Sequence, residues 1–246
     1  MPTAIVTGGA VRIGKAFACH LAEKGFDIAL HYNSSASKAG ETMERIRRSG
    51  VRCKGYSCDF NDLVASEGLI RRIVGDFPDI TLLLNSASNF ILENIEQTSF
   101  KTLVNSINVN LLTPYLLMRE YKKNVNRGMI VNIVDERILK NIPTFAAYSV
   151  SKVGLAHLTH LAAIEWGATI RVNGIAPGLI LPPPWETDDY LKREAGKIPV
   201  RKHGSPENLV KGLDYLIENT FVNGEILFID GGESKSPGYA FLPKSQ

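Results

Sequence analysis

The feature that most constrains the fold is an alternation between short apolar runs and amphipathic stretches. The run AIVTG at 4–8 is followed by RIGKAFACHLAEKG, and the run IALHY at 28–32 by ASKAGETMERIRRSG. This alternation is typical of parallel strands joined by helices that cover both faces of a sheet. We therefore expect an α/β fold with a Rossmann-type, doubly wound parallel sheet of about seven strands. The candidate strands lie at 4–8, 28–32, 51–60, 81–88, 129–134, 170–175 and 225–232.

Length and composition fit one domain. A chain of 246 residues, 44% of them hydrophobic, can bury a full core, so we expect a single domain over 1–246. The net charge of +3 includes no long run of Lys or Arg, so neither nucleic acid nor a membrane surface is expected as a partner. Three cysteines (Cys19, Cys53 and Cys58), no membrane-length apolar stretch and no leader-like start predict a cytoplasmic location.

Several longer elements are also predicted. Long helices are expected near 99–124 and 146–168, and SPENLVKGLDYLIE is expected to form a helix with Ser205 as its N-cap and Pro206 as its first residue. Three prolines in LILPPPWETDD exclude a helix or a central strand there, so the segment about 179–200 is expected to be a loop over a site. The segment about 233–246 has the composition of a tail.

A glycine-rich turn, TGGAVRIG, joins the first strand to the first helix. Backbone N–H groups and the helix dipole favour a phosphate at such a junction. Arg12 stands at the middle position, where glycine is usual, and the second strand ends in HYNSS without a carboxylate for a ribose 2′-hydroxyl. Arg12, Ser34 and Ser35 offer a cation and hydroxyl donors to a 2′-phosphate, so NADPH is favoured over NADH. Asp59 is expected either to bind the adenine amino group or to act as a helix cap.

Tyr148 and Lys152 form a candidate catalytic pair. Their spacing of four residues places both side chains on one face of a helix. An ordinary Tyr has a pKa near 10 and is a weak acid–base group, whereas a nearby ammonium stabilises its phenolate. A YxxxK pair alone is more often a surface feature, but here the glycine turn precedes it in the chain.

Six motifs occur in the order and spacing of the short-chain dehydrogenases/reductases, which the chain resembles over nearly its whole length. The resemblance implies that Asn110 holds a proton-relay water, that Tyr148 is the general acid, and that Lys152 lowers the pKa of the Tyr and binds the nicotinamide ribose. The motifs are the TGGAVRIG turn, Asp59, NSAS at 85–88, Asn110 in NVNL, the Tyr148 and Lys152 pair, and IAPG at 175–178. The residues expected at the cofactor are Gly8, Arg12, Ile13, Gly14, His31, Tyr32, Asn33, Ser34, Ser35, Asp59, Phe60, Asn85, Ser86, Ala87, Ser88, Tyr148, Lys152, Pro177, Gly178, Leu179 and Ile180.

Asp135 stands thirteen residues before Tyr148, where that family usually has a serine. The chain is similar here to the pteridine reductases and the dihydromonapterin or dihydrofolate reductases, which carry an aspartate. The resemblance implies that Phe90 stacks on a pterin ring. Leu179 and Trp185 are expected to close over it, or Trp185 covers the edge of the core instead. A pterin C=N bond must gain a proton on nitrogen, and a carboxylate can serve that need. An Asp beside Tyr148 is also expected to raise the pKa of the Tyr, in opposition to Lys152.

Alternatives remain open from the sequence. Asp135 could instead cap the turn after the fifth strand or pair with Arg137. A ketone reductase acting on acyl-carrier substrates could use Arg127 and Arg171 to dock the carrier, and a binding protein could keep the fold without chemistry. His157 and His160 share a helix face without a third ligand, so no metal site is expected.

Assembly is the last expectation. The two long helices resemble those through which this family pairs, so we expect a homotetramer. The tail at 239–246 is expected to reach a neighbouring subunit.

Overall fold

The computed structural model describes residues 1–236. Seven strands form one parallel sheet, which confirms the fold predicted from the alternation of apolar and amphipathic stretches. The strands are β1 (Thr3–Val6), β2 (Asp27–Tyr32), β3 (Cys53–Ser57), β4 (Ile80–Asn85), β5 (Gly128–Ile133), β6 (Ile170–Pro177) and β7 (Ile226–Ile229).

The strand order is β3-β2-β1-β4-β5-β6-β7. The chain therefore starts in the middle of the sheet, builds outward to β3, and then returns to the other side of β1 to add β4. This reversal makes β1 and β4 the switch point of the sheet, and ligands of such folds bind in the crevice outside the carboxyl ends of the strands there. The topology thus predicts the location of a site independently of any motif.

Helices connect the strands and cover the sheet. The α-helices are α1 (Arg12–Glu23), α2 (Ala36–Arg47), α3 (Leu63–Asp76), α4 (Phe100–Ile107), α5 (Thr113–Asn124), α6 (Ala146–Trp166), α7 (Asp189–Ala195) and α8 (Pro206–Glu218). Three shorter elements are the π-helix η1 (Asn108–Leu112) and the 3₁₀ turns η2 (Glu136–Leu139) and η3 (Glu233–Lys235).

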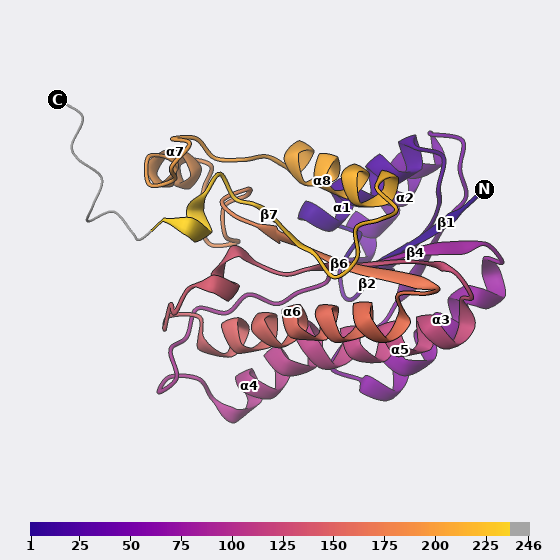
Figure 1. Ribbon diagram of the computed structural model, residues 1–246, viewed down its shortest axis with the longest axis horizontal. Helices are drawn as coiled ribbons and strands as arrows, with labels where there is room; N and C mark the ends of the chain where they lie inside the picture. The colour runs from indigo at the N-terminus through magenta and orange to yellow at the C-terminus, as the bar shows by residue number, and fades with distance from the viewer. Residues whose placement is uncertain (237–246) are drawn as a thin grey trace.

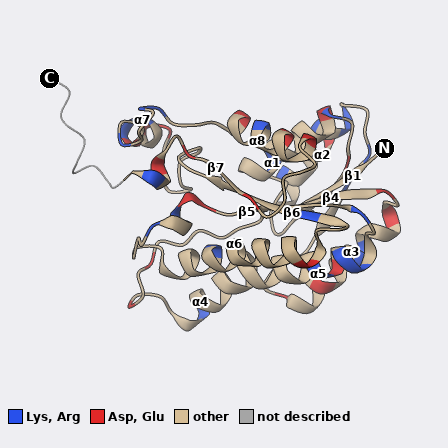
Figure 2. Ribbon diagram, viewed as in Figure 1, with Lys and Arg blue, Asp and Glu red and all other residues tan. Residues whose placement is uncertain are grey.

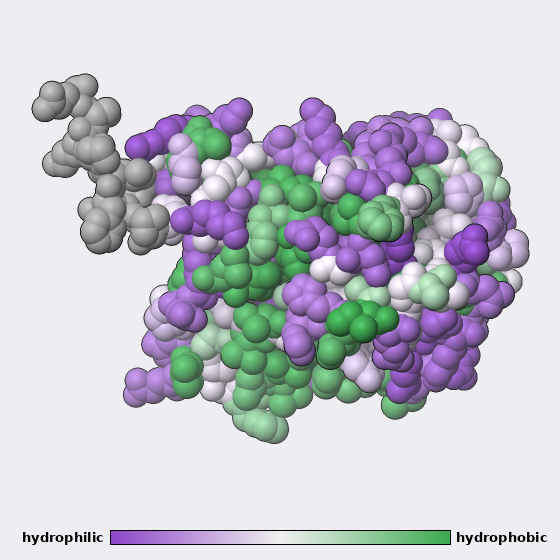
Figure 3. Space-filling model, viewed as in Figure 1, coloured by the Kyte–Doolittle hydropathy of each residue, from purple (hydrophilic) through white to green (hydrophobic). Residues whose placement is uncertain are grey.

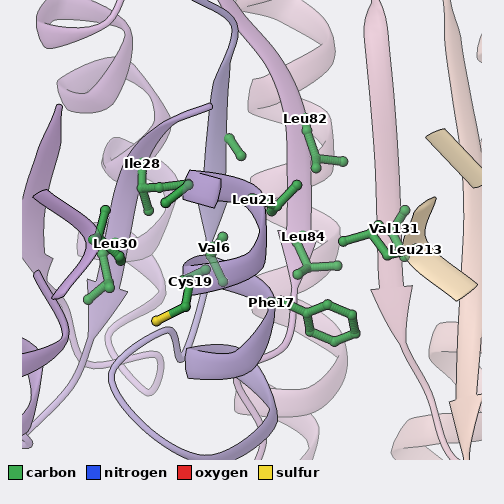
Figure 4. Packing of buried hydrophobic residues seen from close by; sticks show 14 of the residues in the cluster. Val6, Phe17, Cys19, Leu21, Ile28, Leu30, Leu82, Leu84, Val131 and Leu213 are labelled. Atoms are coloured by element: carbon green, nitrogen blue, oxygen red, sulfur yellow. The ribbon is translucent and has the colours of Figure 1, made fainter. Parts of the chain in front are cut away.

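Figure 1 shows two helical layers around the sheet, with α1, α2 and α8 on one face and α3, α5 and α6 on the other. Each layer buries its own apolar cluster against the strands. Phe17 and Leu21 of α1 pack with Val6, Leu84 and Leu213 in the first cluster (Figure 4). Alternate residues of the central strands point to opposite clusters, so the strands are apolar on both faces, as a covered parallel sheet requires.

The segment predicted as one helix near 99–124 is interrupted. Helix α4 starts after Ser99, whose side chain accepts a hydrogen bond from the Thr102 backbone N–H, and passes through η1 into α5. Pro114 lies in the first turn of α5 and has no N–H to donate to the carbonyl of Asn110, four residues before it. A π-helical turn at this point accommodates the missing donor.

The other predicted elements lie close to their expected positions. Helix α6 ends at Trp166, two residues before the predicted end, and α8 starts at Pro206 with a capping box between Ser205 and Asn208. The proline-rich stretch is a loop that ends in the short helix α7, and the tail-like segment begins with η3. The tail at 239–246 lies outside the described residues. Among the residues that are described, none of the helices is both long and apolar enough to span a membrane.

Candidate active site

A cavity of about 680 Å³ lies at the carboxyl ends of the central strands. Its wall includes the segments that follow β1, β4, β5 and β6, which are the strands on both sides of the switch point. The loop before α7, together with α7 and η3, completes the wall, and Figure 2 shows charges of both signs at this end of the molecule. The fold and the motifs therefore point to the same place.

The glycine turn forms one end of the cavity. Gly8 has a φ of +63°, and a Cβ there would lie 2.8 Å from the Cα of Ala87 after β4. A Cβ on Gly14 would collide with the carbonyl group of Gly8. Only glycine therefore fits at these two positions, and the first turn of α1 can approach a ligand with its backbone N–H groups exposed.

Arg12 adopts the left-handed conformation, with a φ of +53°. This conformation favours glycine, which explains why glycine is usual at the position, and it costs other residues about 1 kcal/mol. The Arg12 side chain lies on the cavity wall and donates a 2.7 Å hydrogen bond from Nη2 to the carbonyl of Pro182. Arg12 thus connects the glycine turn to the proline-rich loop.

His31 has a structural role beside this turn. Its ring stacks on Phe60 at 3.9 Å, its Nδ1 accepts from the Gly8 backbone N–H at 3.2 Å, and its Nε2 donates to the Cys58 carbonyl at 3.0 Å. Burial lowers the pKa of His31 to about 4, so the ring is neutral, as these two bonds require. His31 lies on the cavity wall, but both of its polar atoms are already bonded to the protein.

A short polar contact in the cavity joins Tyr148 to Asp135. The Tyr148 hydroxyl donates a 2.7 Å hydrogen bond to Oδ2 of Asp135, and both residues are buried. Asp135 also caps η2 by accepting from the Arg137 backbone N–H at 2.9 Å, and it pairs with the Arg137 guanidinium at 3.3 Å. One carboxylate therefore makes both the contacts that cap η2 and the contact with the Tyr148 hydroxyl.

Burial and the Asp135 carboxylate together raise the pKa of Tyr148 well above its ordinary value, as expected from the sequence. Lys152 does not offset this effect. Its Nζ donates to the Ile133 carbonyl at 2.8 Å and lies 5.6 Å from the centre of the Tyr148 ring. Burial lowers the pKa of Lys152 to about 8. In this protein without ligands, Tyr148 therefore keeps its proton at neutral pH.

Asn110 is fully buried in η1. Its Oδ1 accepts from the Ser88 hydroxyl and the Asn89 backbone N–H, both at 3.0 Å, and its Nδ2 donates to Oδ1 of Asn89 at 2.8 Å and to the Ser151 hydroxyl at 3.1 Å. These bonds connect η1 to the segment after β4 and to α6. The side chain thus fixes the elements that carry the cavity residues.

Phe90 lies between two aromatic rings. It stacks on Phe145 at 4.4 Å and lies parallel to Trp185 at 5.7 Å, with Tyr148 edge-on at 4.8 Å. Phe145 precedes α6 and Trp185 belongs to the proline-rich loop, so three distant segments meet here. The contacts hold the Phe90 ring beside Tyr148.

Comparisons with known proteins agree with this geometry. Residues 2–189 match the model of the short chain dehydrogenase family. A 2-dehydro-3-deoxy-D-gluconate 5-dehydrogenase from Pseudoalteromonas atlantica is 31% identical over 244 residues, which cover 93% of this chain and 94% of that protein. The chain belongs to the short-chain dehydrogenase family. It is therefore an oxidoreductase.

Other members of the short-chain dehydrogenase family are similar over most of this chain. A 3-oxoacyl-[acyl-carrier-protein] reductase from Staphylococcus aureus is 26% identical, and the match covers 94% of this chain and 97% of that protein. Two solved structures of alternative dihydrofolate reductase 1 with NADP, from Brucella suis and Brucella canis, each have a TM-score of 0.90. The Brucella suis protein is 31% identical, and the match covers 95% of this chain and 95% of that chain. The Brucella canis protein is 32% identical, and the match covers 96% of this chain and 94% of that chain.

Most residues predicted for this short-chain dehydrogenase site lie on the cavity wall. They are Gly8, Arg12, Ile13, Gly14, His31, Asn33, Ser35, Asp59, Phe60, Ser86, Ala87, Ser88, Phe90, Asp135, Tyr148, Lys152, Pro177, Gly178, Leu179 and Ile180. Asp59 also accepts from the Asn61 backbone N–H at 2.9 Å, but the N-cap of α3 is Asp62, so Asp59 is not the helix cap that the alternative interpretation expected.

The structure places the other predicted residues behind or beside that wall. Asn85 is buried and donates to Oδ1 of Asn132 at 2.8 Å, and Asn110 is bonded as described above. Tyr32 alternates with His31 along β2 and packs on the opposite side, and Ser34 is exposed in the following turn. Trp185 is 50% exposed and reaches the site through its contact with Phe90.

Sequence reasoning missed five charged residues of the wall, among them Glu194 of α7 and Lys197 just after that helix. Arg137 and Glu136 belong to η2, and Glu233 of η3 accepts from the Leu179 backbone N–H at 3.2 Å. Lys140 bridges Glu136, at 2.8 Å, and Glu233, at 3.6 Å. The sequence DER after the fifth strand was a signal for Glu136 and Arg137. Glu233 was assigned to the tail, and only the tertiary structure brings it to the site.

Proposed function

We propose that the protein is an NADPH-dependent reductase that transfers a hydride to a C=N bond of a pteridine, such as dihydrofolate, dihydromonapterin or a biopterin-like compound. The observation that carries the proposal is the 2.7 Å hydrogen bond from the Tyr148 hydroxyl to Asp135 on the cavity wall. The similarity to two alternative dihydrofolate reductases solved with NADP supports it.

The residues at the glycine turn fit a dinucleotide phosphate. Gly8 and Gly14 line the cavity at the first turn of α1, where backbone N–H groups and the helix dipole favour a pyrophosphate. Arg12, Asn33 and Ser35 line the same end of the cavity and offer a cation and polar donors to a 2′-phosphate. We therefore propose NADPH as the cofactor. When bound, it supplies the hydride.

The protein's own residues would supply the proton. Hydride addition to the carbon of a C=N bond moves the π electron pair to nitrogen, which then takes one proton to form an amine. Tyr148 holds a proton on its hydroxyl at neutral pH because burial and Asp135 raise its pKa. Asp135 and Tyr148 together would deliver that proton, and Asp135 would also accept a bond from a ring N–H. Lys152 and Arg137 place positive charge near the phenolate that remains.

Phe90 supports the assignment to a flat ring. It lies edge-on to Tyr148, at 4.8 Å between ring centres, and parallel to both Phe145 and Trp185. Aromatic rings in this arrangement favour stacking of a planar heterocycle. Leu179 lines the same cavity, so the proline-rich loop would contribute one aliphatic and one aromatic contact to the substrate.

A ketone reductase is the second candidate, because the chain is also similar to a 3-oxoacyl-[acyl-carrier-protein] reductase. Asp135 argues against it. A ketone oxygen requires a hydrogen-bond donor, and a carboxylate that already accepts from Tyr148 and Arg137 offers none to it.

The test is NADPH oxidation by the wild-type protein with four substrates side by side. They are dihydrofolate, dihydromonapterin, biopterin and an acetoacetyl thioester. We expect turnover of at least one pteridine at a kcat/KM well above that for the thioester. Turnover of the thioester alone would contradict the proposal.

A further inference from the structure

Arg137 is a charged residue beside the proposed reacting pair, and none of the family motifs recognised in the sequence includes it. Its Nη1 lies 3.3 Å from each carboxylate oxygen of Asp135, and its backbone N–H donates to Oδ1 at 2.9 Å. The side chain is 24% exposed and forms part of the cavity wall. It can therefore influence Asp135 through direct contact.

The guanidinium is held by neighbours from three segments. Its Cζ lies 5.4 Å from the centre of the Phe90 ring and 5.2 Å from that of Phe145, both within the range of cation–π contacts. Its Nε lies 3.9 Å from Oε1 of Glu136. Because two aromatic rings and two carboxylates surround its guanidinium, Arg137 is partly pre-organised rather than a free surface cation.

The bonds of Asp135 show what Arg137 contributes. Oδ1 accepts from the backbone N–H and Nη1 of Arg137, and Oδ2 accepts from the Tyr148 hydroxyl and from the same Nη1. A carboxylate has about four acceptor positions, so Arg137 and Tyr148 together fix its rotation. Without the guanidinium, a carboxylate that is only 13% exposed would lose its counter-charge, which favours a change of rotamer toward solvent.

We propose that Arg137 is a positioning residue that holds the Asp135 carboxylate against the Tyr148 hydroxyl, and so aligns the pair for the nitrogen of the incoming ring. The chemistry served by this alignment rests on the proposed function. The alignment itself does not, since it concerns atoms within this chain. Two other roles are distinguishable, namely direct binding of substrate by Arg137 and packing against Phe90 and Phe145.

Kinetics of three variants separate these roles. Arg137→Met keeps an unbranched apolar stem but removes the guanidinium, so we expect kcat to fall about 10- to 100-fold, with a change of less than about twofold in the NADPH dissociation constant. Arg137→Lys should recover part of the loss because it restores the charge. Lys140→Met removes a cation from the same turn without touching Asp135, and should keep kcat within about twofold.

A double-mutant cycle decides whether Arg137 acts through Asp135. In an Asp135→Ser background, Arg137→Met should change kcat by less than about twofold, because the group that it positions is gone. Equal losses in the two backgrounds would overturn the proposal and indicate direct contact with substrate. The cycle can use any substrate that the wild type reduces.

A crystal structure of Arg137→Met tests the placement without any turnover. We expect the Asp135 carboxylate to leave hydrogen-bond distance of the Tyr148 hydroxyl. A carboxylate that stays on Tyr148 at the wild-type distance overturns the positioning role, whatever the substrate is. Wild-type inactivity toward all pteridines would instead contradict the proposed function. It would not contradict the placement of the Asp135 carboxylate by Arg137.

Discussion

At the residue scale, the site depends on side chains that make two contacts at once. Asp135 caps η2 and also binds Tyr148, and Arg12 lies on the cavity wall while it holds the Pro182 carbonyl. The sequence indicated both residues because each departs from a usual pattern. Asp135 stands where a serine is usual, and Arg12 stands where a glycine is usual. It did not indicate that Arg12 takes the left-handed conformation, since that depends on the close approach of Gly8 to Gly14.

Arg12 yields the first prediction. Arg12→Ala should weaken NADPH binding by about 1 to 3 kcal/mol, the range for loss of a charge-assisted bond, with much less effect on NADH. Arg12→Gly should weaken NADPH binding similarly but unfold at a higher temperature than Arg12→Ala, because glycine adopts a φ of +53° without strain. Titration of both cofactors and a thermal melt check this. Equal losses for NADPH and NADH would disprove recognition of the 2′-phosphate.

At the element scale, most of the fold was predictable and the exceptions have local causes. The strands and helices α6 and α8 follow from apolar periodicity and caps, which are properties of neighbouring residues. The π-helix η1 was not predicted, although Pro114 was a visible signal for a break in that helix. The contact of Lys152 with β5 was missed because helical spacing indicates a shared face with Tyr148, but not which acceptor lies opposite that face.

Helix α6 carries Lys152 into the interior, where only 3% of its surface is exposed. Burial lowers its pKa to about 8 from 10.5, so the folded state binds this proton less tightly than the unfolded state. The resulting destabilisation is complete below pH 8 and fades as the pH rises toward 10.5. Lys152→Met should therefore raise the melting temperature of the ligand-free protein at pH 7 by a few degrees, and by less at pH 10, while turnover is lost.

Lys101→Met is the matched control, because Lys101 is exposed on α4. Melts of both variants and the wild type at pH 7 and pH 10 give the comparison. A Lys152→Met protein that is less stable than the wild type at pH 7 would show that the bond to the Ile133 carbonyl outweighs the burial of charge.

At the scale of the whole molecule, one surface carries a group of exposed apolar side chains. Figure 3 shows apolar side chains gathered over the lower centre, where Figure 1 places α4 and α6. His157 and His160 are also exposed on α6, as expected for residues that face solvent or an interface. The exposed apolar residues of α4, η1, α5 and α6 include Leu103, Val104, Leu112, Tyr115, Val150, Val153, Leu161 and Ile164. An exposed apolar surface of this kind marks an interaction site.

We predict that this face pairs subunits and that the protein is a homotetramer. Val153→Glu should produce smaller species at micromolar concentration, because a charge would be buried at the contact. Val64→Glu on α3, where the native side chain is 83% exposed, should leave the assembly unchanged. Light scattering of the three proteins measures this. A monomeric wild type would refute it.

The most direct test of the proposed function is Asp135→Ser, which restores the residue usual in the family. If Asp135 and Tyr148 protonate a pteridine nitrogen, the variant should lose about 10²- to 10⁴-fold in pteridine turnover and bind NADPH nearly as well as the wild type. Tyr148→Phe should lose at least as much. Steady-state rates and a thermal melt on the same preparation separate chemistry from stability. Full pteridine activity in Asp135→Ser, or a gain of ketone reduction without that loss, would contradict the assignment.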